Sequence, residues 1–492
     1  MTDDIRSRPN VLFIVMDTAR YANIFSDPEV MPELREIASE GVRFENAFAN
    51  APWTVPSHSS MFTGQYPSDH GVHAGNKQFN PEKPVLAELF RDAGYRTAAF
   101  SNNTWLSPEF GFDRGFDSFF VRWELFEGGV DLSAIAKADT LRGQFRAAAD
   151  ALASREAPLT LFNLLYAVYL RYQSESYDSG ARRTNERLFD WLDDGDESFF
   201  GFVNYVEPHL PYEPPPEYVD AFLPTDMEPS RLESVNQDPW AYLAGDLEMD
   251  DRDFDALEAL YNAELRYLDD RIAEVYDRLD ALGELDETMI VVVGDHGENL
   301  GDHGMMDHQY CLYDTLLHVP LVIRYPDKFT PGTEVTDAVE LRDLFPTLLD
   351  AASIPAPEPA SSVSQRSLAD SVGESNSTPV FAEYLAPQPS MDALRRKLDG
   401  ALPESMTHYD RALRAIRTDQ WKLIEGSDGT VELYCLDSED EMDDCSATNP
   451  EVVRQLRNRL ETSRGTFTLN ESSTPEMNRM TRQRLEDLGY IQ

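Results

Sequence analysis

The chain has 492 residues, of which 41% are hydrophobic and 11% aromatic, so it can bury a large core and is neither disordered nor fibrous. Its 89 acidic residues outnumber its 42 basic ones and give a formal net charge of -47. This balance argues against nucleic acid as a partner, because phosphate binding needs clustered Lys and Arg. Concentrated cations would screen the self-repulsion, so we expect a cytoplasmic protein of a high-salt organism.

The cysteines and the apolar runs bear on the compartment. Cys311, Cys435 and Cys445 are an odd and sparse set, unlike a secreted disulfide framework, and indicate a reduced compartment. The apolar run at residues 11–16 is too short for a signal peptide or a membrane span and predicts a strand. Residues 159–170 are also shorter than a span and predict a buried helix, with a lipid-touching surface helix as the alternative. We therefore expect no membrane span.

Strand-like and helical patterns alternate along the chain. The helical patterns lie between the strand-like runs, and the clearest, residues 254–282, repeats apolar side chains at three- and four-residue steps from Leu265 through Leu268 and Ile272 to Leu279. The alternation predicts the α/β class, with a mostly parallel central sheet sandwiched by helices. The expected strands, all rich in Val, Ile, Phe or Tyr, are residues 11–16, 96–101, 199–205, 289–293 and 319–324.

A passage rich in Pro, Ser and Ala, residues 354–379, interrupts this alternation and is typical of a linker. Beyond it, residues 414–433 predict short strands with a turn at 426–429, and residues 450–462 predict a helix packed on them. We expect a catalytic domain at 1–365 with an insertion at about 121–197, a small C-terminal α+β subdomain with antiparallel strands at 366–470, and a polar tail at 471–492.

Polar residues follow two of the expected strands. Asp17 comes after the first strand, and Asp295 with His296 comes after the strand at 289–293, in the string VVVGDHGE. Ligands of open α/β sheets bind at the carboxyl ends of the strands. Carboxylate and imidazole groups brought together there suit a divalent cation. The alternative is structural, with Asp17 as a helix cap and His296 in a polar gap of the core.

The string WTVPSHSSMFTG, residues 53–64, contains a second feature. Pro56 follows Thr54 by two residues and a short helical segment comes next, so the Thr54 hydroxyl is expected at a helix N-terminus. Free backbone N–H groups at that end favour an anion such as phosphate or sulfate. The alternative is an ordinary N-cap.

Together the two features resemble the sulfatase family of the alkaline-phosphatase superfamily. Sulfatases carry a Cys or Ser, then x-Pro-Ser-Arg and later Thr-Gly, and they open with a strand that ends in a metal-binding Asp and carry a later Asp followed by Asn or His. Further similar strings are GFDRGFD, EPHLPY and LRDLFPTLLDAA. The resemblance is nearly end to end and implies an alkaline-phosphatase-like fold. The matching residues here are Asp17, Thr54, Pro56, Ser57, Thr63, Gly64, Asp295 and His296.

The departures from the family are specific. Sulfatases oxidise the Cys or Ser to formylglycine, but Thr54 has a β-methyl group and cannot give that aldehyde. His58 stands in place of the family's Arg, and Thr18 in place of a second Asp ligand. The family's Lys-x-His is replaced by the string SNNT, residues 101–104.

Thr nucleophiles occur in related branches of the superfamily, namely nucleotide pyrophosphatase/phosphodiesterases and phosphoglycerol and phosphoethanolamine transferases. In those transferases an acidic residue, the Thr and an Asp-His pair hold a single metal. The resemblance thus implies one divalent ion, Ca, Mg, Mn or Zn, held by Asp17, Thr54, Asp295 and His296.

The resemblance also implies substrate contacts. His209 matches the family's histidine in the His-x-Pro loop and is expected to act as a general acid, with a structural histidine as the alternative. His308 takes the place of a Lys that touches the sulfate. We expect Asn102 or Asn103 to hold a non-bridging oxygen, and His58 to contact the substrate.

The sequence therefore predicts a metal-dependent hydrolase that cleaves a sulfate or phosphate ester with Thr54 as nucleophile, on a small molecule or a glycan. The first alternative is a phosphodiesterase or a phosphoglycerol- or phosphoethanolamine-type transferase. The second is a catalytically inactive glycan-binding homologue. The oligomeric state is left open.

Overall fold

The structure is a computed structural model that describes residues 8–121, 180–195, 197–357, 367–371, 378–398, 402–436 and 441–467. The predicted helix at 159–170 and the predicted tail at 471–492 lie outside the described residues, as does most of the expected insertion.

An eight-stranded sheet forms the centre of the described structure, and it is mostly parallel as predicted. Strand β1 runs parallel to β6 and β7, whereas β11 runs antiparallel to both of its neighbours. The predicted strand at 319–324 is split at Pro320, which has no N–H for a continuous ladder. In spatial order the sheet consists of β12 (Thr333–Val335), β2 (Val42–Phe44), β11 (Leu321–Arg324), β7 (Thr288–Gly294), β1 (Asn10–Met16), β6 (Phe199–Tyr205), β4 (Arg96–Ser101) and β5 (Ser118–Val121).

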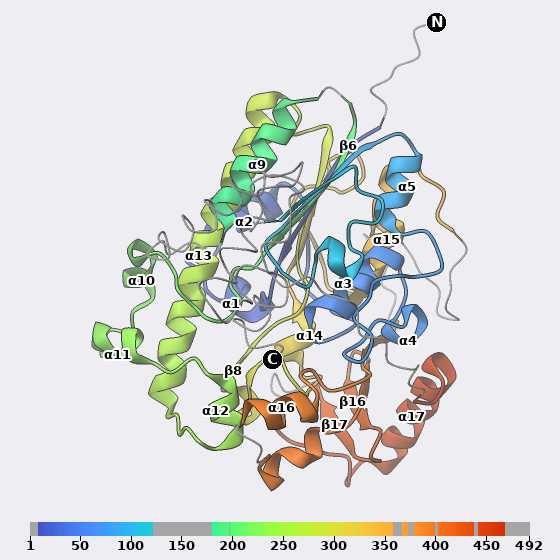
Figure 1. Ribbon diagram of the computed structural model, residues 1–492. Coiled ribbons are helices and arrows are strands. Elements are labelled where there is room, and N and C mark those ends of the chain that lie inside the picture. Colours follow the sequence, from blue (N-terminus) through green and yellow to red (C-terminus); the bar gives the residue numbers. More distant parts are fainter. Residues whose placement is uncertain are drawn as a thin grey trace, which may run out of the picture.

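Helices cover both faces of this sheet (Figure 1). Every residue of β1 is buried, because alternate side chains enter two different cores. On one face Leu12 and Ile14 join the core of the long helix α13, and on the other Val11 and Phe13 join the core beneath α3 and α15. The first face carries α1 (Tyr21–Ser26), α2 (Pro32–Ser39), α9 (Ala181–Asp193), α10 (Pro216–Phe222), α11 (Pro229–Ser234) and α13 (Asp251–Leu282), and the second carries α3 (Thr54–Thr63), α4 (Pro67–His70), α5 (Leu86–Asp92) and α15 (Leu344–Ala351).

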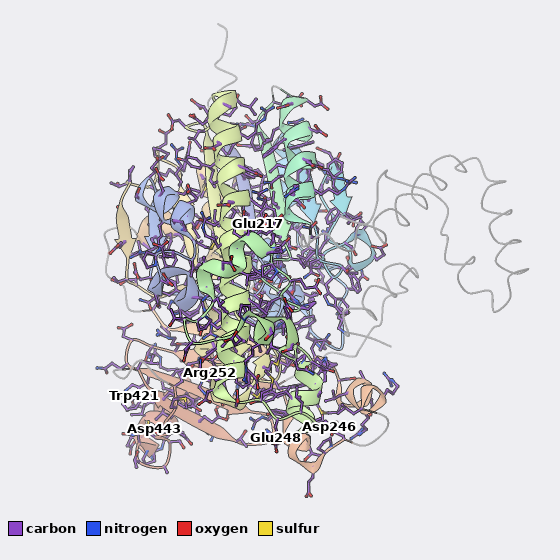
Figure 2. All side chains as sticks on the ribbon, turned by 90° about the vertical axis from the view of Figure 1, so that its left-hand side faces the viewer. Glu217, Asp246, Glu248, Arg252, Trp421 and Asp443 are labelled. Carbon is purple, nitrogen blue, oxygen red and sulfur yellow. The ribbon has the colours of Figure 1, made fainter. Side chains whose placement is uncertain are left out.

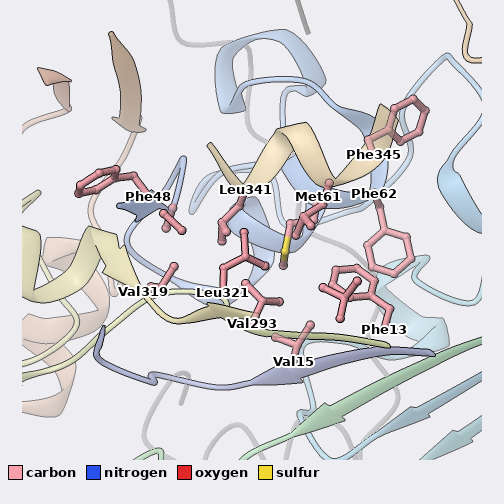
Figure 3. Close-up of a cluster of buried hydrophobic side chains, with 14 of the residues drawn as sticks. Phe13, Val15, Phe48, Met61, Phe62, Val293, Val319, Leu321, Leu341 and Phe345 are labelled. Carbon is pink, nitrogen blue, oxygen red and sulfur yellow. The ribbon is translucent and has the colours of Figure 1, made fainter. Parts of the chain in front are cut away.

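The two helices that matter most begin at defined signals. The predicted helix at 254–282 is α13, and it starts earlier because Asp250 caps its N-terminus in a capping box with Asp253. Helix α3 is fixed to the sheet by apolar side chains: Met61 and Phe62 point toward Phe13 and Val293 of the strands below (Figure 3). This packing determines where the N-terminus of α3 lies.

The C-terminal part contains the predicted antiparallel strands and the helix packed on them. Leu456 and Leu460 of the helix share a small core with Ile416, Leu423 and Leu433 of the strands. The sheet order is β14 (Val380–Tyr384), β15 (Leu413–Arg417), β16 (Trp421–Gly426) and β17 (Val431–Cys435), and the helix is α17 (Pro450–Arg464).

The remaining short elements are β3 (Ala47–Phe48), β8 (Asn299–Leu300), β9 (Met306–Asp307), β10 (His318–Val319), β13 (Val339–Glu340), α12 (Pro239–Ala244), α14 (Asp314–Leu317), α16 (Met391–Lys397) and the 3-10 turns Pro108–Phe110, Asp302–Gly304, Leu341–Asp343, Leu368–Ser371 and Glu404–Tyr409.

The surface carries much of the acidic charge. Figure 2 shows the exposed carboxylates of Glu217, Asp246, Glu248 and Asp443 on one side of the molecule. The three cysteines are free thiols. Among the described residues, no helix combines the length and the apolar character that a membrane crossing requires.

Candidate active site

Two neighbouring strands bring the predicted metal ligands together. In the parallel pair β1 and β7, Met16 lies opposite Gly294, so Asp17 and Asp295 leave the sheet side by side at its carboxyl edge. Asp17, Asp295 and His296 are fully buried, and Thr54, the first residue of α3, is 2% exposed. The four residues come from three separate segments of the chain, and the fold alone makes them neighbours.

His296 lies at the centre of this group. Its Nε2 is 3.5 Å from Asp17 Oδ1, 3.5 Å from Asp295 Oδ2 and 3.4 Å from Thr54 Oγ1. Its Nδ1 lies 2.9 Å from the carbonyl oxygen of Gly297, an acceptor, so Nδ1 carries the proton and Nε2 keeps a lone pair. Burial lowers the pKa of His296 well below its usual range, which favours the neutral imidazole. A neutral imidazole whose Nε2 faces two carboxylates is the form that binds a metal ion.

The two carboxylates lack the partners that buried charges usually have. Within the described residues, Asp17 Oδ1 and Asp295 Oδ2 accept no hydrogen bond, and neither group pairs with a Lys or Arg. Burial raises the pKa of Asp17, and burial together with the charge of Asp17 raises the pKa of Asp295. Two such groups repel each other unless a cation lies between them. The oxygen and imidazole donors therefore fit a divalent cation.

The other oxygen of Asp295 is held by the backbone. Oδ1 accepts hydrogen bonds from the N–H groups of Thr18, at 3.2 Å, and His296, at 2.9 Å. Ser57 Oγ donates to the carbonyl oxygen of Asp295 at 2.6 Å, which ties the strand end to α3. Thr18 has a φ of 60°, rare for a β-branched residue, and in this conformation its N–H points at Asp295. These contacts leave Oδ2 of Asp295 free to face His296 Nε2.

The two predicted substrate-binding asparagines have different partners. Asn103 Nδ2 donates to Asp17 Oδ2, and Asn103 Oδ1 accepts from the N–H of Trp105 at 2.9 Å, so Asn103 orients a predicted metal ligand. Asn102 Oδ1 accepts from Thr184 Oγ1 at 2.9 Å, while its buried Nδ2 has no hydrogen-bond partner among the described residues. The amide of Asn102 thus has both N–H groups without a partner in the described part of the chain, whereas Asn103 uses one of its two on Asp17.

His58 lies one helical turn after Thr54 and is close to two of the candidate metal ligands. Its Nδ1 is 2.9 Å from the Thr54 carbonyl oxygen and 3.4 Å from Asp295 Oδ2. Burial lowers the pKa of His58 to about 3, so the ring is neutral at ordinary pH. Its buried Nε2 has no hydrogen-bond partner within the described part of the chain.

Two further imidazoles, those of His209 and His308, lie on the other side of His296. The rings of His209 and His308 are 5.1 Å apart, and those of His296 and His308 are 4.6 Å apart. His308 Nδ1 lies 2.6 Å from Asp307 Oδ1 and 3.6 Å from Glu298 Oε1. Burial alone would lower the pKa of His308, but these carboxylates raise it well above its usual range. His308 is therefore held as an imidazolium beside the neutral His296.

Sequence reasoning missed Asp307 and Glu298. Both are buried, and both oxygens of Glu298 accept no hydrogen bond from described residues. Burial alone would raise the pKa of Asp307, but His308 lowers it to about 2, so the pair is ionic. Asp307 also has a φ of 70°. The strings GDHGE and MDH contained these carboxylates next to predicted site residues, which was the available signal.

Carboxylates, imidazoles and a helix-terminal hydroxyl thus meet at the carboxyl edge of a parallel sheet, where ligands of such folds bind. The chain matches the family model described as Sulfatase over residues 9–354, and it belongs to the sulfatase family.

Individual relatives agree with this assignment. The chain is 26% identical over 376 residues to the uncharacterized sulfatase YidJ of Escherichia coli (strain K12), which covers 71% of this chain and 69% of that protein. It is also 26% identical over 398 residues to the arylsulfatase of Clostridium perfringens (strain 13 / Type A), covering 75% of this chain and 80% of that protein. The structure of the phosphonate monoester hydrolase of Agrobacterium radiobacter superposes with a TM-score of 0.67 at 21% identity and covers 92% of this chain and 95% of that one, which supports the fold.

Proposed function

We propose that this chain is a metal-dependent ester hydrolase that cleaves a sulfate or phosphate ester, with Thr54 as the nucleophile. The observation that carries the proposal is the position of the Thr54 hydroxyl. It lies at the N-terminus of α3 and 3.4 Å from His296 Nε2, within the group formed by Asp17 and Asp295. The names of the relatives, an arylsulfatase and a phosphonate monoester hydrolase among them, support ester hydrolysis as the reaction class.

The nucleophile needs activation, because a free Thr hydroxyl is weak at neutral pH. One divalent ion held by Asp17, Thr54, Asp295 and His296 would lower the pKa of that hydroxyl and offset charge on the ester. Ca, Mg, Mn and Zn remain the candidates. Asn103 keeps Asp17 in place through its hydrogen bond to Oδ2.

The chain's other side chains fit roles around the reacting group. Thr54 gives its hydroxyl proton to water and its Oγ attacks sulfur or phosphorus in line. The ester bond to the leaving oxygen breaks, and His209 protonates that oxygen as a general acid. The His308 imidazolium contacts an oxygen of the transferred group, and the unpartnered Nδ2 of Asn102 donates to another. We assign His58 to the substrate only through its buried Nε2. Water then cleaves the covalent ester on Thr54 and regenerates the hydroxyl.

Thr54 also favours a second candidate, a phosphodiesterase or a head-group transferase. The β-methyl group of Thr excludes the formylglycine aldehyde and leaves direct attack by the alkoxide, which phosphoryl chemistry also uses. In the transferase case an acceptor alcohol replaces the water of the second step.

The test compares nitrophenyl sulfate, nitrophenyl phosphate, a nitrophenyl phosphonate ester and bis-nitrophenyl phosphate with the metal-loaded protein in concentrated KCl. Thr54→Ala should lose turnover on the best substrate by a factor on the order of 10³ or more. Thr54→Ser, the matched control, retains the hydroxyl and should keep measurable turnover. Unchanged turnover in Thr54→Ala would remove Thr54 from the reaction, and the ranking of the substrates separates the two candidates.

A further inference from the structure

A cation outside the predicted site lies without an acidic partner. The ammonium of Lys77 lies over the indole ring of Trp105, with Nζ 4.5 Å from the ring centroid. The chain has 89 acidic residues, yet Lys77 forms no ion pair or hydrogen bond through its side chain within the described residues. Burial lowers the pKa of Lys77 to about 8. The Lys77 side chain is partly buried, and a partly desolvated ammonium has a cost in free energy that an anionic ligand would offset.

The indole beneath Lys77 lies next to residues of the candidate site. Trp105 directly follows the segment 101–104, and its ring meets the edge of Trp53 at 6.4 Å between centroids. Trp53 is the residue before Thr54, and the Trp105 N–H donates to Asn103. Lys77 therefore packs on an indole that contacts both the N-cap residue of α3 and the segment that supports Asp17.

The same segment offers hydrogen-bond donors to an anion. Asn102 Nδ2 and Thr104 Oγ1 are buried, and neither has a hydrogen-bond partner among the residues the structure describes. Residues 101–104 form the string SNNT, which carries no charge. Lys77 supplies a positive charge beside that neutral segment, from a different loop.

The loop that carries Lys77 is anchored on both sides. His73 and Asn76 exchange two backbone hydrogen bonds, of 2.9 and 2.8 Å, and Asn76 Nδ2 donates to the carbonyl oxygen of Gly71 at 2.9 Å. After Lys77, Phe79 donates its N–H to Phe110 at 2.8 Å and its ring stacks on another aromatic ring. The ammonium is thus presented from a fixed backbone, which favours binding of a ligand in one orientation.

We propose that Lys77 is a substrate-binding residue whose ammonium contacts an oxygen of the sulfate or phosphate group, together with the donors of Asn102 and Thr104. This rests on the proposed function, since it names a further contact of the same site. The ligand class is a tetrahedral oxyanion.

The experiment measures the Kd of inorganic sulfate and inorganic phosphate for the full-length, metal-loaded protein by isothermal titration calorimetry in KCl. Lys77→Met keeps the stem on the indole and should weaken binding of the better anion by about tenfold or more. Lys77→Arg keeps the charge and should stay within about threefold of the wild type. Lys328→Met is the control, because Lys328 pairs with Asp350 at the surface and lies outside the site.

The melting temperature separates binding from folding. Without an added anion, Lys77→Met should melt no lower than the wild type, because a desolvated charge has been removed. The rise in melting temperature that the anion causes in the wild type should shrink in the variant. Equal Kd values for wild type and Lys77→Met, or a wild type that binds neither anion, would overturn the proposal. Failure of the wild type to hydrolyse any ester would instead count against the proposed function, and anion binding would still report on Lys77.

Discussion

Two buried groups of charges in this molecule have opposite balances. The edge cluster consists of Asp17, Asp295, Glu298 and Asp307 with the imidazoles around them, and no Lys or Arg pairs with these carboxylates in the described part of the chain. The joint cluster links α14 to the C-terminal sheet and consists of Asp314, Arg417, Lys422 and Glu441. There Lys422 Nζ lies 2.6 Å from Asp314 and 2.7 Å from Glu441, and Arg417 adds a third contact at 3.2 Å.

The same burial therefore has opposite consequences. It raises the pKa of Asp295, with the charge of Asp17 acting in the same direction. Burial would also raise the pKa of Asp314, but Lys422 and Arg417 lower it well below its usual range. Asp314 is held by two cations and joins two parts of the fold, although the pKa of its neighbour Glu441 is raised to about 7 by burial and by Asp314. Asp17 and Asp295 of the edge cluster have no Lys or Arg partner among the described residues and repel each other at a cost in stability.

The largest effect is expected from a substitution in the edge cluster. Asp295→Asn should lower turnover by a factor on the order of 10³, because in the proposed function Asp295 helps to hold the ion that activates Thr54, and it should reduce bound metal measured by elemental analysis. The metal-free variant should nevertheless be about 1 kcal/mol more stable than the metal-free wild type, because one of two repelling buried charges is gone. Urea unfolding in the presence of a chelator measures this. A clear loss of stability would show that the edge cluster is built like the joint cluster.

The second-largest effect is expected from a substitution in the joint cluster. Lys422→Met removes a fully buried ammonium and leaves Glu441 without its cation, so the free energy of unfolding should fall by about 3 kcal/mol. Lys328→Met is again the control, because its pair with Asp350 is partly exposed and should change stability by less than about 1 kcal/mol. Similar losses in the two variants, measured by urea unfolding, would contradict the structural role of the joint cluster.

The fold and the candidate metal ligands could be predicted because the sequence patterns that indicate them are local. Each β-rich run ends in a polar residue, and the carboxyl ends of parallel strands meet at one edge, which was enough to place Asp17 beside Asp295. The split of the strand at Pro320 and the early start of α13, which Asp250 caps, each depend on a single residue at an element boundary. Average composition does not reveal such residues.

The partners of individual side chains were not predictable. Asn102 and Asn103 are chemically identical neighbours, and only the backbone direction sends one to Thr184 and the other to Asp17. The ion pair of His308 with Asp307 depends on the backbone conformation at Asp307. Lys77 contacts Trp105 from a different loop, and no sequence motif contains both residues. Such contacts come from tertiary packing and leave no periodic trace in a single sequence.

The third effect tests the edge cluster without a mutation. An ion that binds the folded protein stabilises it by about 2.7 kcal/mol when present at a hundred times its Kd, so removal of the metal should lower the melting temperature. Scanning calorimetry with Mn²⁺, Zn²⁺, Mg²⁺ or Ca²⁺ returned after chelation would rank the ions. Asp295→Asn should show no such recovery. An identical melting temperature with and without every ion would contradict the assignment of the edge cluster to a cation.

The smallest effect concerns a third kind of buried group, a neutral histidine away from both clusters. His70 Nδ1 accepts the N–H of Val72 at 3.1 Å, its Nε2 lies 3.2 Å from Ser60 Oγ, and burial lowers its pKa to about 3. Because the folded pKa lies below the unfolded value, the stabilising effect is present above about pH 6.5 and is lost as the pH falls toward 3.

His70→Asn keeps an acceptor for Val72 but does not titrate. Between pH 6 and pH 5 the free energy of unfolding should therefore fall by about 1 kcal/mol more in the wild type than in the variant. Urea unfolding at pH 7, 6 and 5 in constant KCl measures the difference, and the titrations of both clusters cancel because the two proteins share them. Parallel curves would mean that His70 accepts a proton without loss of its contacts, and that acid sensitivity comes from the charged clusters alone.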